Sequence, residues 1–514
     1  MKNAENQIVN IINFIRGCEP RCEVDLKKPV FEQLKLLKKH GFRGTFLIQY
    51  DALVSEDFAD VREELKASGH EIGVWLEIVK PLAEEAALEW RGRYPWDWHA
   101  DVGFSVGYTL EERGRLIDTL FHKFKEVFGY YPRVMGSWII DAHTLKYASD
   151  KYGLDATCNC KDQWGTDGYT LWGAYYNQAY YPSINNVFCP AGSKKTQIDV
   201  PLFRMLGSDP VYQYDAGLDL NDGAADIQGV VTLEPVYCGN GGGGNPEWVD
   251  WYLAENFNGK CLAFSYTQAG QENSFGWDAM RDGLIYQFEC FEQLKKDKKI
   301  TVETLGESGR KYKAKYPLTV PTAVTAESDW LESGKKSVWY SCKNYRINIF
   351  CEDNTFFIRD AHVFDDAYRE RYFDEICRDP VLKFDNLPLV DGNRWSGNGV
   401  RAGLFFLKDG ETLTYTDMLY EEPDLGTAKL TFCGTECGDV ILILSEDSVR
   451  ITVSRPEGFS LDFRHGKNAL LPEVISDNNN YFVFRHNGYE YGIEQLVECK
   501  EKVLNISFTR IFSR

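Results

Sequence analysis

Carboxylate side chains follow several predicted β-strands of this sequence. They are Glu19, Glu77, Asp141, Glu234 and Glu272, which come after the first, third, fourth, sixth and seventh strands. Two carboxyl groups, one protonated and one ionised, are what acid-catalysed cleavage of a glycosidic bond requires. The five carboxylates are therefore candidate catalytic residues. We expect Asp141 to act as nucleophile or base and Glu234 as general acid, with Glu77 and Glu272 in reserve.

Each carboxylate also has a structural interpretation, because Asp and Glu at strand ends often cap the next helix or pair with arginine. Glu19 lies between Arg16 and Arg21, which fits an ion pair, and Asp141 precedes a predicted helix, which fits an N-cap. Glu234 is the hardest to explain structurally, because Pro235 follows it and has no backbone N–H to offer.

Aromatic and basic side chains accompany these carboxylates, and flat rings suit the apolar faces of sugars. The candidate substrate-binding residues are Arg16, Trp75, Trp96, Trp98, His99, Trp138, His143, Tyr266 and Trp277. Residues 91–108, RGRYPWDWHADVGFSVGY, form a long irregular segment that is either a sugar-stacking platform or a loop packed over the fold. A second aromatic segment, residues 163–183, has the same character, and two such loops over one rim would wall a cleft.

The composition limits the classes of partner. There are 77 acidic and 57 basic residues, for a formal charge of −20, and such a surface repels phosphate backbones. We therefore expect a carbohydrate substrate, neither nucleic acid nor membrane as partner, and leave a homo-oligomer open. The 14 cysteines are scattered, and the first residues do not read as a signal peptide, so a cytoplasmic location is expected. No second Cys or His pair stands at ligand spacing, so no metal and no cofactor are predicted.

The first 320 residues alternate short apolar runs with helical segments, which is typical of a parallel sheet built from βα repeats. The predicted strands are 8–15, 44–49, 71–76, 133–140, 155–159, 229–236 and 261–267. One predicted helix ends at Gly41, and another runs between a Thr109 N-cap, supported by Glu112, and Gly129. Without a glycine-rich phosphate turn, seven strands favour a closed or nearly closed (β/α) barrel. Its active face would be the strand ends, where Asn159, Lys161 and Asp162 follow the fifth strand.

From about Lys336 onward short alternating strands predominate, which indicates an antiparallel β-sandwich. Proline and small polar residues place the boundary between 318 and 335. The predicted fold class is thus α/β, with a seven-stranded (β/α) barrel at 1–325 and a C-terminal β-sandwich accessory domain at 335–514.

The opening strand, the run HGFRGTFLI and above all ASGHEIGVW resemble the polysaccharide deacetylases and the glycoside hydrolase/deacetylase barrel superfamily, over roughly the first 160 residues. The later run TLGESGRKYKAKYPL resembles bacterial members of that superfamily whose domains have no assigned function. In the deacetylases an Asp-Asp pair follows the first strand, and GHEIG leads into a His-x-x-x-His metal motif. Here the first loop offers only Glu19, and Trp75 and Val79 stand at the two histidine positions.

The resemblance therefore implies the fold but not the metal-dependent reaction. Related glycoside hydrolases of this superfamily use paired carboxylates, one after the fourth strand, where this chain has Asp141. Two other functions stay open. Another sugar-directed enzyme, such as a metal-independent esterase, lyase or epimerase, would use His99 or His143 as base. A non-catalytic glycan-binding protein would have the aromatic cleft without two facing carboxylates.

Overall fold

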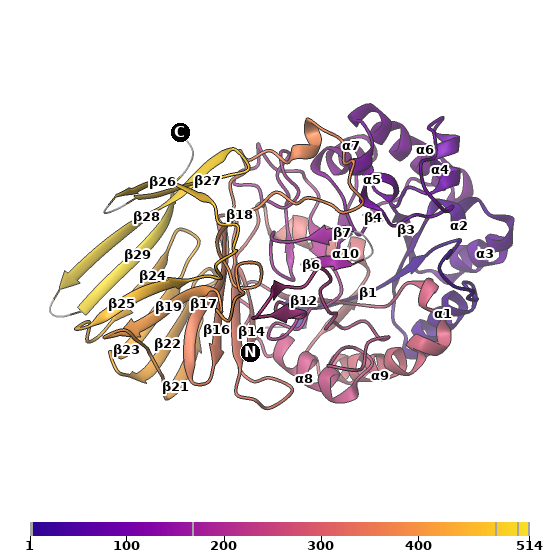
Figure 1. Cartoon of the computed structure of the whole chain (residues 1–514). Helices are drawn as coiled ribbons and strands as arrows, with labels where there is room; N and C mark the ends of the chain where they lie inside the picture. The colour runs from indigo at the N-terminus through magenta and orange to yellow at the C-terminus, as the bar shows by residue number, and fades with distance from the viewer. Residues whose placement is uncertain (1–3, 167–168, 479–480, 501–502, 512–514) are drawn as a thin grey trace.

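The computed structural model describes residues 4–166, 169–478, 481–500 and 503–511, and places a helix-rich half beside a strand-rich half (Figure 1). The helix-rich half is a curled, mainly parallel sheet surrounded by helices. The strand-rich half consists of antiparallel sheets from the C-terminal part of the chain. None of the described helices is both long and apolar enough to cross a lipid bilayer.

The curled sheet places seven parallel strands side by side, with an eighth strand antiparallel at one edge. In spatial order they are β12 (Ser265–Ala269), β1 (Gln7–Ile15), β2 (Thr45–Ile48), β3 (Glu71–Trp75), β4 (Val134–Gly136), β5 (Ala156–Asn159), β9 (Leu202–Arg204) and β8 (Ala179–Tyr180), while β13 (Thr301–Glu303) also pairs with β1. The two edges approach each other, since the Leu206 amide donates to Gln268 Oε1 at 2.9 Å and Phe203 packs on Tyr266. The mixed α/β class with a curled parallel sheet is confirmed.

The sixth parallel strand is not the predicted one. The predicted strand 229–236 is largely irregular, with one bridge between Thr232 and Ser208, and β9 takes its place in the sheet. The run VVTLEP is apolar enough to suggest a strand, but Pro235 has no N–H for a ladder. Three residues of β9 are too few to show a periodicity.

The helices form where the sequence provides caps. Thr109 and Glu112 make the expected capping box, and Gly41 and Gly129 end their helices with positive φ values of 62° and 85°. The α-helices are α1 (Lys28–His40), α2 (Tyr50–Val54), α3 (Ala59–Ser68), α4 (Lys80–Glu85), α5 (Ala100–Gly103), α6 (Leu110–Phe128), α7 (Ala142–Tyr152), α8 (Pro246–Asn256), α9 (Trp277–Lys296) and α10 (Leu305–Lys315). Short 3₁₀ turns are η1 (Ala4–Asn6), η2 (Glu56–Phe58), η3 (Ser105–Gly107), η4 (Asn273–Phe275) and η5 (Arg371–Phe373).

Large aromatic side chains fill the inside of the curled sheet. Trp75 packs against Phe14 and Trp138, with ring centroids 4.3 and 5.2 Å away. Glycines make room for them, because a Cβ on Gly136 would lie 2.9 Å from the Trp75 ring, and one on Gly73 would lie 2.5 Å from the Val134 backbone. Helix α10 closes the opposite end of the sheet, where the Gly306 amide donates to Glu71. The interior is therefore a packed core, and chemistry is confined to the strand ends.

Two antiparallel sheets follow. The inner one contains β14 (Thr322–Ala326), β15 (Lys336–Ser341), β16 (Tyr345–Glu352), β17 (Thr355–Val363), β18 (Leu387–Asp391), β19 (Gly403–Lys408), β20 (Glu411–Thr412) and β25 (Phe459–Arg464). The outer one contains β21 (Asp417–Glu421), β22 (Ala428–Thr435), β23 (Gly438–Leu444), β24 (Val449–Val453), β26 (Glu473–Asn478), β27 (Tyr481–His486), β28 (Tyr489–Lys500) and β29 (Val503–Ile511). Two hairpins lie apart, β6 (Gln163–Thr166) with β7 (Tyr169–Leu171) and β10 (Leu218–Asp219) with β11 (Gly223–Ala224).

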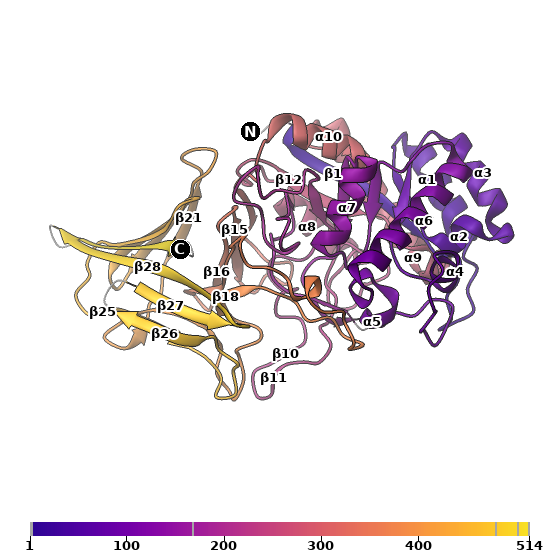
Figure 2. The ribbon, with the colours of Figure 1, turned by 90° about the horizontal axis from the view of Figure 1, so that it is seen from above.

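The two sheets share a hydrophobic cluster, in which Phe356 of β17 stacks on Phe432 of β22 at 3.8 Å. Seen from above, β15 and β16 lie beside the helix-rich half, and β25 to β28 lie farther out (Figure 2). The strands expected after residue 336 are confirmed, and β14 already lies inside the predicted boundary 318–335.

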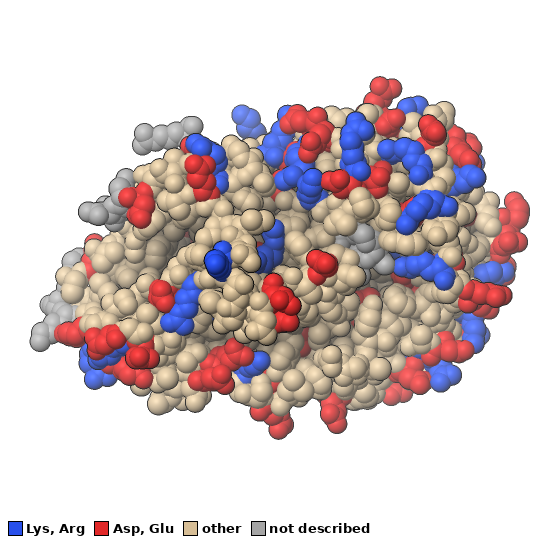
Figure 3. Space-filling view, viewed as in Figure 1, with Lys and Arg blue, Asp and Glu red and all other residues tan. Residues whose placement is uncertain are grey.

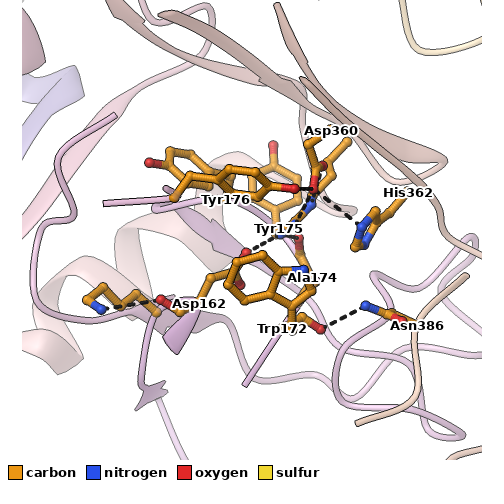
Figure 4. A network of polar contacts seen from close by, with 12 residues as sticks. Asp162, Trp172, Ala174, Tyr175, Tyr176, Asp360, His362 and Asn386 are labelled. Atoms are coloured by element: carbon orange, nitrogen blue, oxygen red, sulfur yellow. Dashed lines mark hydrogen bonds and ion pairs between the residues drawn. The ribbon is translucent and has the colours of Figure 1, made fainter. Parts of the chain in front are cut away.

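Buried charges join the inner sheet to the curled sheet. Arg346 of β16 is fully buried and binds Asp360 of β17 at 2.9 Å and Asp162, after β5, at 2.6 Å. Asp162 also accepts from Arg204 of β9 at 3.0 Å. Figure 4 shows Asp162 and Asp360 in this network, with Tyr176 alongside. The two halves are thus joined by ion pairs that are buried away from solvent.

We expect Arg346→Met to lower the free energy of unfolding by about 3 to 5 kcal/mol, because Asp162 and Asp360 would lose the guanidinium they share while staying buried. Urea unfolding followed by tryptophan fluorescence measures this. Arg485→Met is the control, since Arg485 is exposed and pairs with Glu473 and Glu490, and it should cost less than about 1 kcal/mol. Equal effects of the two substitutions would contradict the role given to Arg346.

Candidate functional site

Arg16 organises the carboxylates at the strand ends. It follows β1 and is 1% exposed, and its guanidinium lies 3.1 Å from Glu77 and 3.2 Å from Glu272. Glu19 lies at 4.0 Å and is held mainly by Arg21 at 2.7 Å. β12, β1, β2 and β3 are parallel neighbours, so their carboxyl ends meet at one edge of the sheet. Glu77 and Glu272, which come 61 and 256 positions after Arg16 in the sequence, therefore share its guanidinium. Together with Glu19, three of the five carboxylates predicted from their places after strands lie here.

The aromatic segment 91–108 closes over this cluster. Trp96 Nε1 donates to Glu77 at 3.1 Å, and the Arg16 guanidinium lies 4.0 Å from the Trp96 ring. Trp98 stacks on Tyr94 and lies under the Arg21 and Arg93 guanidiniums. The segment is pinned by a backbone bridge between Val79 and Trp96. The side chains of Glu77 and Glu272 are covered in this structure, with exposed fractions of 0% and 4%.

The environments of these glutamates differ. Burial raises the pKa of Glu77 to about 7, against the opposing charge of Arg16 and with support from the negative charge of Glu272. Burial also acts to raise the pKa of Glu19, but the hydrogen bonds from Arg21 outweigh it and hold the pKa below its ordinary value. Glu77 can therefore exchange a proton near neutral pH, and Glu19 stays ionised.

Glu234 joins the same cluster from the irregular segment after β9. It is 6% exposed and accepts from Thr232 at 2.8 Å and from Gln271 at 3.4 Å. Burial raises the pKa of Glu234, the charge of Glu272 raises it further, and Thr232, Lys161 and Gln271 act in the opposite direction. Gln271 precedes Glu272, and its Oε1 accepts from the Glu272 amide at 3.0 Å. Glu234 thus keeps its proton more readily than an ordinary glutamate.

Asp141 sits in a different network. It caps α7 through the Thr144 amide at 2.8 Å and binds Ser105 at 2.6 Å and Arg113 at 3.1 Å. Burial acts to raise its pKa, but Arg113 and these hydrogen bonds hold it below the ordinary value. Glu370 from the loop after β17 lies beside it, and burial together with the charge of Asp141 raises the pKa of Glu370 to about 8. The partners of Asp141 and of Glu234 do not overlap, so the expected pairing of the two gains no support from their contacts.

The other predicted residues fall into two groups. Trp75 and Trp138 line the interior directly below Arg16, next to Phe14. The remaining ones lie apart from the carboxylates. His99 is 4.0 Å from Asp97, His143 Nε2 is 3.3 Å from the Leu110 carbonyl, Tyr266 packs on Phe203 inside the sheet, and Trp277 begins α9.

A cleft of about 550 Å³ borders the segment that carries Glu234. Tyr212, Tyr237 and Trp330 line it together with the glycines at 239 and 241. A second cavity of about 550 Å³ opens between the two C-terminal sheets, where Figure 3 shows the surface hollowed, and all of its lining residues lie between 344 and 510. The first cleft borders the segment that carries Glu234, and a small pocket elsewhere is lined by Asp141 and Glu370.

The metal chemistry of the deacetylases does not fit these residues. Trp75 and Val79, which the sequence resemblance sets at the two metal-histidine positions, have no ligand atom for zinc: Trp75 packs on Phe14 and Val79 is fully buried. Within the described ranges no group of three or more His, Cys, Asp and Glu side chains is arranged to hold a metal ion. No step of a reaction is therefore derived through a metal.

Three features were not predicted from the sequence: Gln271, the aromatic cleft and Glu370. Gln271 stands at a strand end, so the reasoning that found Glu77 and Lys161 could have found it. The aromatic cleft and Glu370 could not be found that way, because Trp330 and Glu370 come from segments far away in the chain. No local pattern ties such residues to a site.

Neither a protein-family model nor a curated protein sequence matches the chain significantly. Among solved structures, a protein from Parabacteroides distasonis described as a glycoside hydrolase/deacetylase superposes with a TM-score of 0.53 at 15% identity, covering 74% of this chain and 91% of that one. This chain has the glycoside hydrolase/deacetylase fold. The resemblance drawn from ASGHEIGVW is thereby confirmed at the level of fold.

Two further structures are more distant. A protein from Mycobacterium smegmatis described as a polysaccharide deacetylase matches at 12% identity with a TM-score of 0.35, covering 61% of this chain and 92% of that one. The 4-α-glucanotransferase from Thermococcus litoralis matches at 11% identity with a TM-score of 0.31, covering 99% of this chain and 98% of that one.

Glu77 should make folding stability depend on pH. Its pKa of about 7 in the folded chain exceeds the ordinary glutamate value of 4.5, so the folded chain holds the proton longer and stability falls as pH rises between these values, by about 3 kcal/mol for this group. Glu77→Gln should flatten that slope. Urea unfolding at about pH 5 and about pH 8 measures it. Glu303→Gln is the control, a buried glutamate bound to Lys311 at 2.6 Å, and an unchanged slope in Glu77→Gln would contradict the assignment.

Proposed function

We propose that this protein is a glycoside hydrolase that cleaves an oligosaccharide with carboxylates at the mouth of a nearly closed seven-stranded barrel. Glu234 is the general acid and Glu272 the ionised partner, as nucleophile or base. The observation that carries the proposal is the joint burial of the two carboxylates around Gln271, in which the charge of Glu272 raises the pKa of Glu234. Two carboxyl groups whose environments push them into different protonation states are the requirement of this reaction.

The neighbouring charges have supporting roles in this proposal. Arg16 holds Glu272 in place at 3.2 Å, and Glu77 shares the same guanidinium. Glu234 would donate its proton to the leaving oxygen in a site from which bulk water is excluded, because Trp96 covers the neighbouring Arg16. Glu77, with a pKa of about 7, is the reserve proton carrier.

The aromatic cleft supports a sugar substrate. Tyr212, Tyr237 and Trp330 offer flat faces beside the segment that carries Glu234, and this arrangement suits a chain of sugar rings. Under this proposal the leaving part of the oligosaccharide lies in the cleft, and segment 91–108 opens to admit the sugar next to Glu234.

The wider organisation is part of the same proposal. Residues 1–325 form the catalytic domain, and residues 335–514 form a β-sandwich accessory domain that supports it through Arg346. The scattered cysteines and the acidic composition support action in the cytoplasm on a carbohydrate, with no nucleic acid or membrane partner.

Carboxyl deletion tests the proposal. On an aryl glycoside or natural oligosaccharide that the parent cleaves, Glu234→Gln and Glu272→Gln should each lower kcat by at least ~100-fold, because each removes an acid, base or nucleophile while keeping the shape. Glu71→Gln is the control, a half-buried glutamate at the opposite end of the sheet that accepts from Thr45 and the Gly306 amide. Asp141→Asn tests the pairing expected from the sequence. If it abolishes turnover with folding unchanged while Glu272→Gln does not, Asp141 is the partner of Glu234.

Metal independence is a separate expectation. Because Trp75 and Val79 occupy the positions of the metal histidines, prolonged dialysis against a chelator should leave kcat unchanged. Steady-state rates before dialysis, after it and after addition of zinc measure this. A loss that zinc restores would show that a metal site exists after all.

A further inference from the structure

Lys161 is a buried cation for which the proposed mechanism has no role so far. It follows β5, is 1% exposed, and donates from Nζ to the Asp162 carbonyl at 3.2 Å. Among the described residues this is its one hydrogen bond, and no carboxylate lies within ion-pair distance of it. An ammonium group has three hydrogens to donate, and burying it unpaired costs several kcal/mol.

The adjacent Asp162 does not neutralise Lys161. Its carboxylate is shared between Arg204 at 3.0 Å and Arg346 at 2.6 Å, and Figure 4 shows it turned into that network. These ion pairs hold Asp162 in place, and Lys161 is the residue directly before it. Arg346 of the strand-rich half therefore helps to position Lys161 in the helix-rich half.

Glu234 is the carboxylate left to act on Lys161. The two influence each other electrostatically across the mouth of the sheet, yet they form no ion pair within 4.0 Å in the described part of the chain. The other charged or titratable groups acting on Lys161 are Cys160, Asp162 and Arg204, and Glu272 acts on Glu234 from the end of β12. Both residues lie at the same edge of the sheet: Lys161 follows β5, and Glu234 follows Leu233, whose amide donates at 2.9 Å to the Leu206 carbonyl just beyond the neighbouring strand β9.

We propose that Lys161 is a catalytic residue that contacts the substrate, donating a hydrogen bond from Nζ to an oxygen of the sugar held against Glu234. This inference rests on the proposed function. Because the surrounding carboxylates repel anions, the oxygen belongs to a neutral sugar, as a hydroxyl or the glycosidic oxygen itself. Burial lowers the pKa of Lys161 because it disfavours the ammonium form, and a hydrogen bond to a substrate oxygen would offset part of that penalty.

The positive charge of Lys161 should also affect how kcat/KM depends on pH. The cation lowers the pKa of Glu234, and a general acid is active only while it holds its proton. Removing the cation should raise that pKa, so the alkaline limb of kcat/KM should move to higher pH. A lysine that merely supports the fold would leave the limb in place.

Lys161→Met, Lys161→Arg and the control Lys313→Met test the inference on a glycoside that the parent cleaves. Lys313 also donates to a backbone carbonyl at 3.2 Å, from α10 at the other end of the sheet. Lys161→Met should lower kcat/KM by at least ~10-fold and move the alkaline limb upward, while Lys161→Arg, which keeps the charge, should leave the limb where it is. The Tm of Lys161→Met should equal or exceed that of the parent, because a buried unpaired ammonium is lost.

The outcomes separate the two proposals. If Glu234→Gln is inactive but Lys161→Met keeps the parent's kcat/KM and pH profile, the inference on Lys161 fails alone. If Lys161→Met instead loses Tm well beyond Lys313→Met with its alkaline limb unmoved, Lys161 supports the fold and the inference is again overturned. A parent protein that cleaves no member of a broad glycoside panel, or a fully active Glu234→Gln variant, overturns the proposed function and this inference together.

Discussion

Buried charges must be paired, and the ion pairs among Asp162, Arg204, Arg346 and Asp360 join the two halves of this chain. Apolar packing alone would hold the inner sheet against the curled sheet, as the stacking of Tyr176 on Trp339 at 3.8 Å shows. It would not fix one register, because flat apolar surfaces can slide. A buried guanidinium that binds two carboxylates from different halves accepts one arrangement only. Here that arrangement also sets the loop that carries Lys161, so the C-terminal strands take part in building the strand-end site.

The same rule acts a second time at the mouth of the curled sheet. Arg16 brings Glu77 and Glu272 together, and Trp96 lies against Arg16 and Glu77. The carboxyl group of Glu77 is therefore desolvated, which is the condition under which a glutamate holds a proton near neutral pH. The contrast with Asp141 is instructive, because it is equally buried but bound by Arg113 and three hydrogen bonds, which leave it ionised.

Much of the curled sheet could be predicted from the sequence, because its signals are local. The strand at 7–15, QIVNIINFI, is rich in isoleucine, and the helix 110–128 carries its own caps in Thr109, Glu112 and Gly129. The prediction failed at the sixth strand, where VVTLEP has the composition of a strand but β9 has the partners. Strand pairing depends on the neighbouring strands, and a segment of three residues has no sequence pattern that predicts it. For the candidate site, the strand ends pointed to Glu77 and Glu272, which the structure brings together at Arg16, whereas the cleft around Trp330 and the position of Glu370 depend on tertiary contacts between distant segments.

The nature of the cations decides which groups can exchange protons at this site. Arg16 stays protonated at any physiological pH, so it can orient Glu77 and Glu272 but cannot take part in proton transfer. Trp75 contributes a flat apolar wall, and Gly136 gives it the space. Burial raises the pKa values of Glu77 and Glu234, so these two glutamates are the groups beside Arg16 that can exchange protons near neutral pH. A site that combines a permanently charged guanidinium with carboxyl groups of raised pKa is suited to acid and base chemistry.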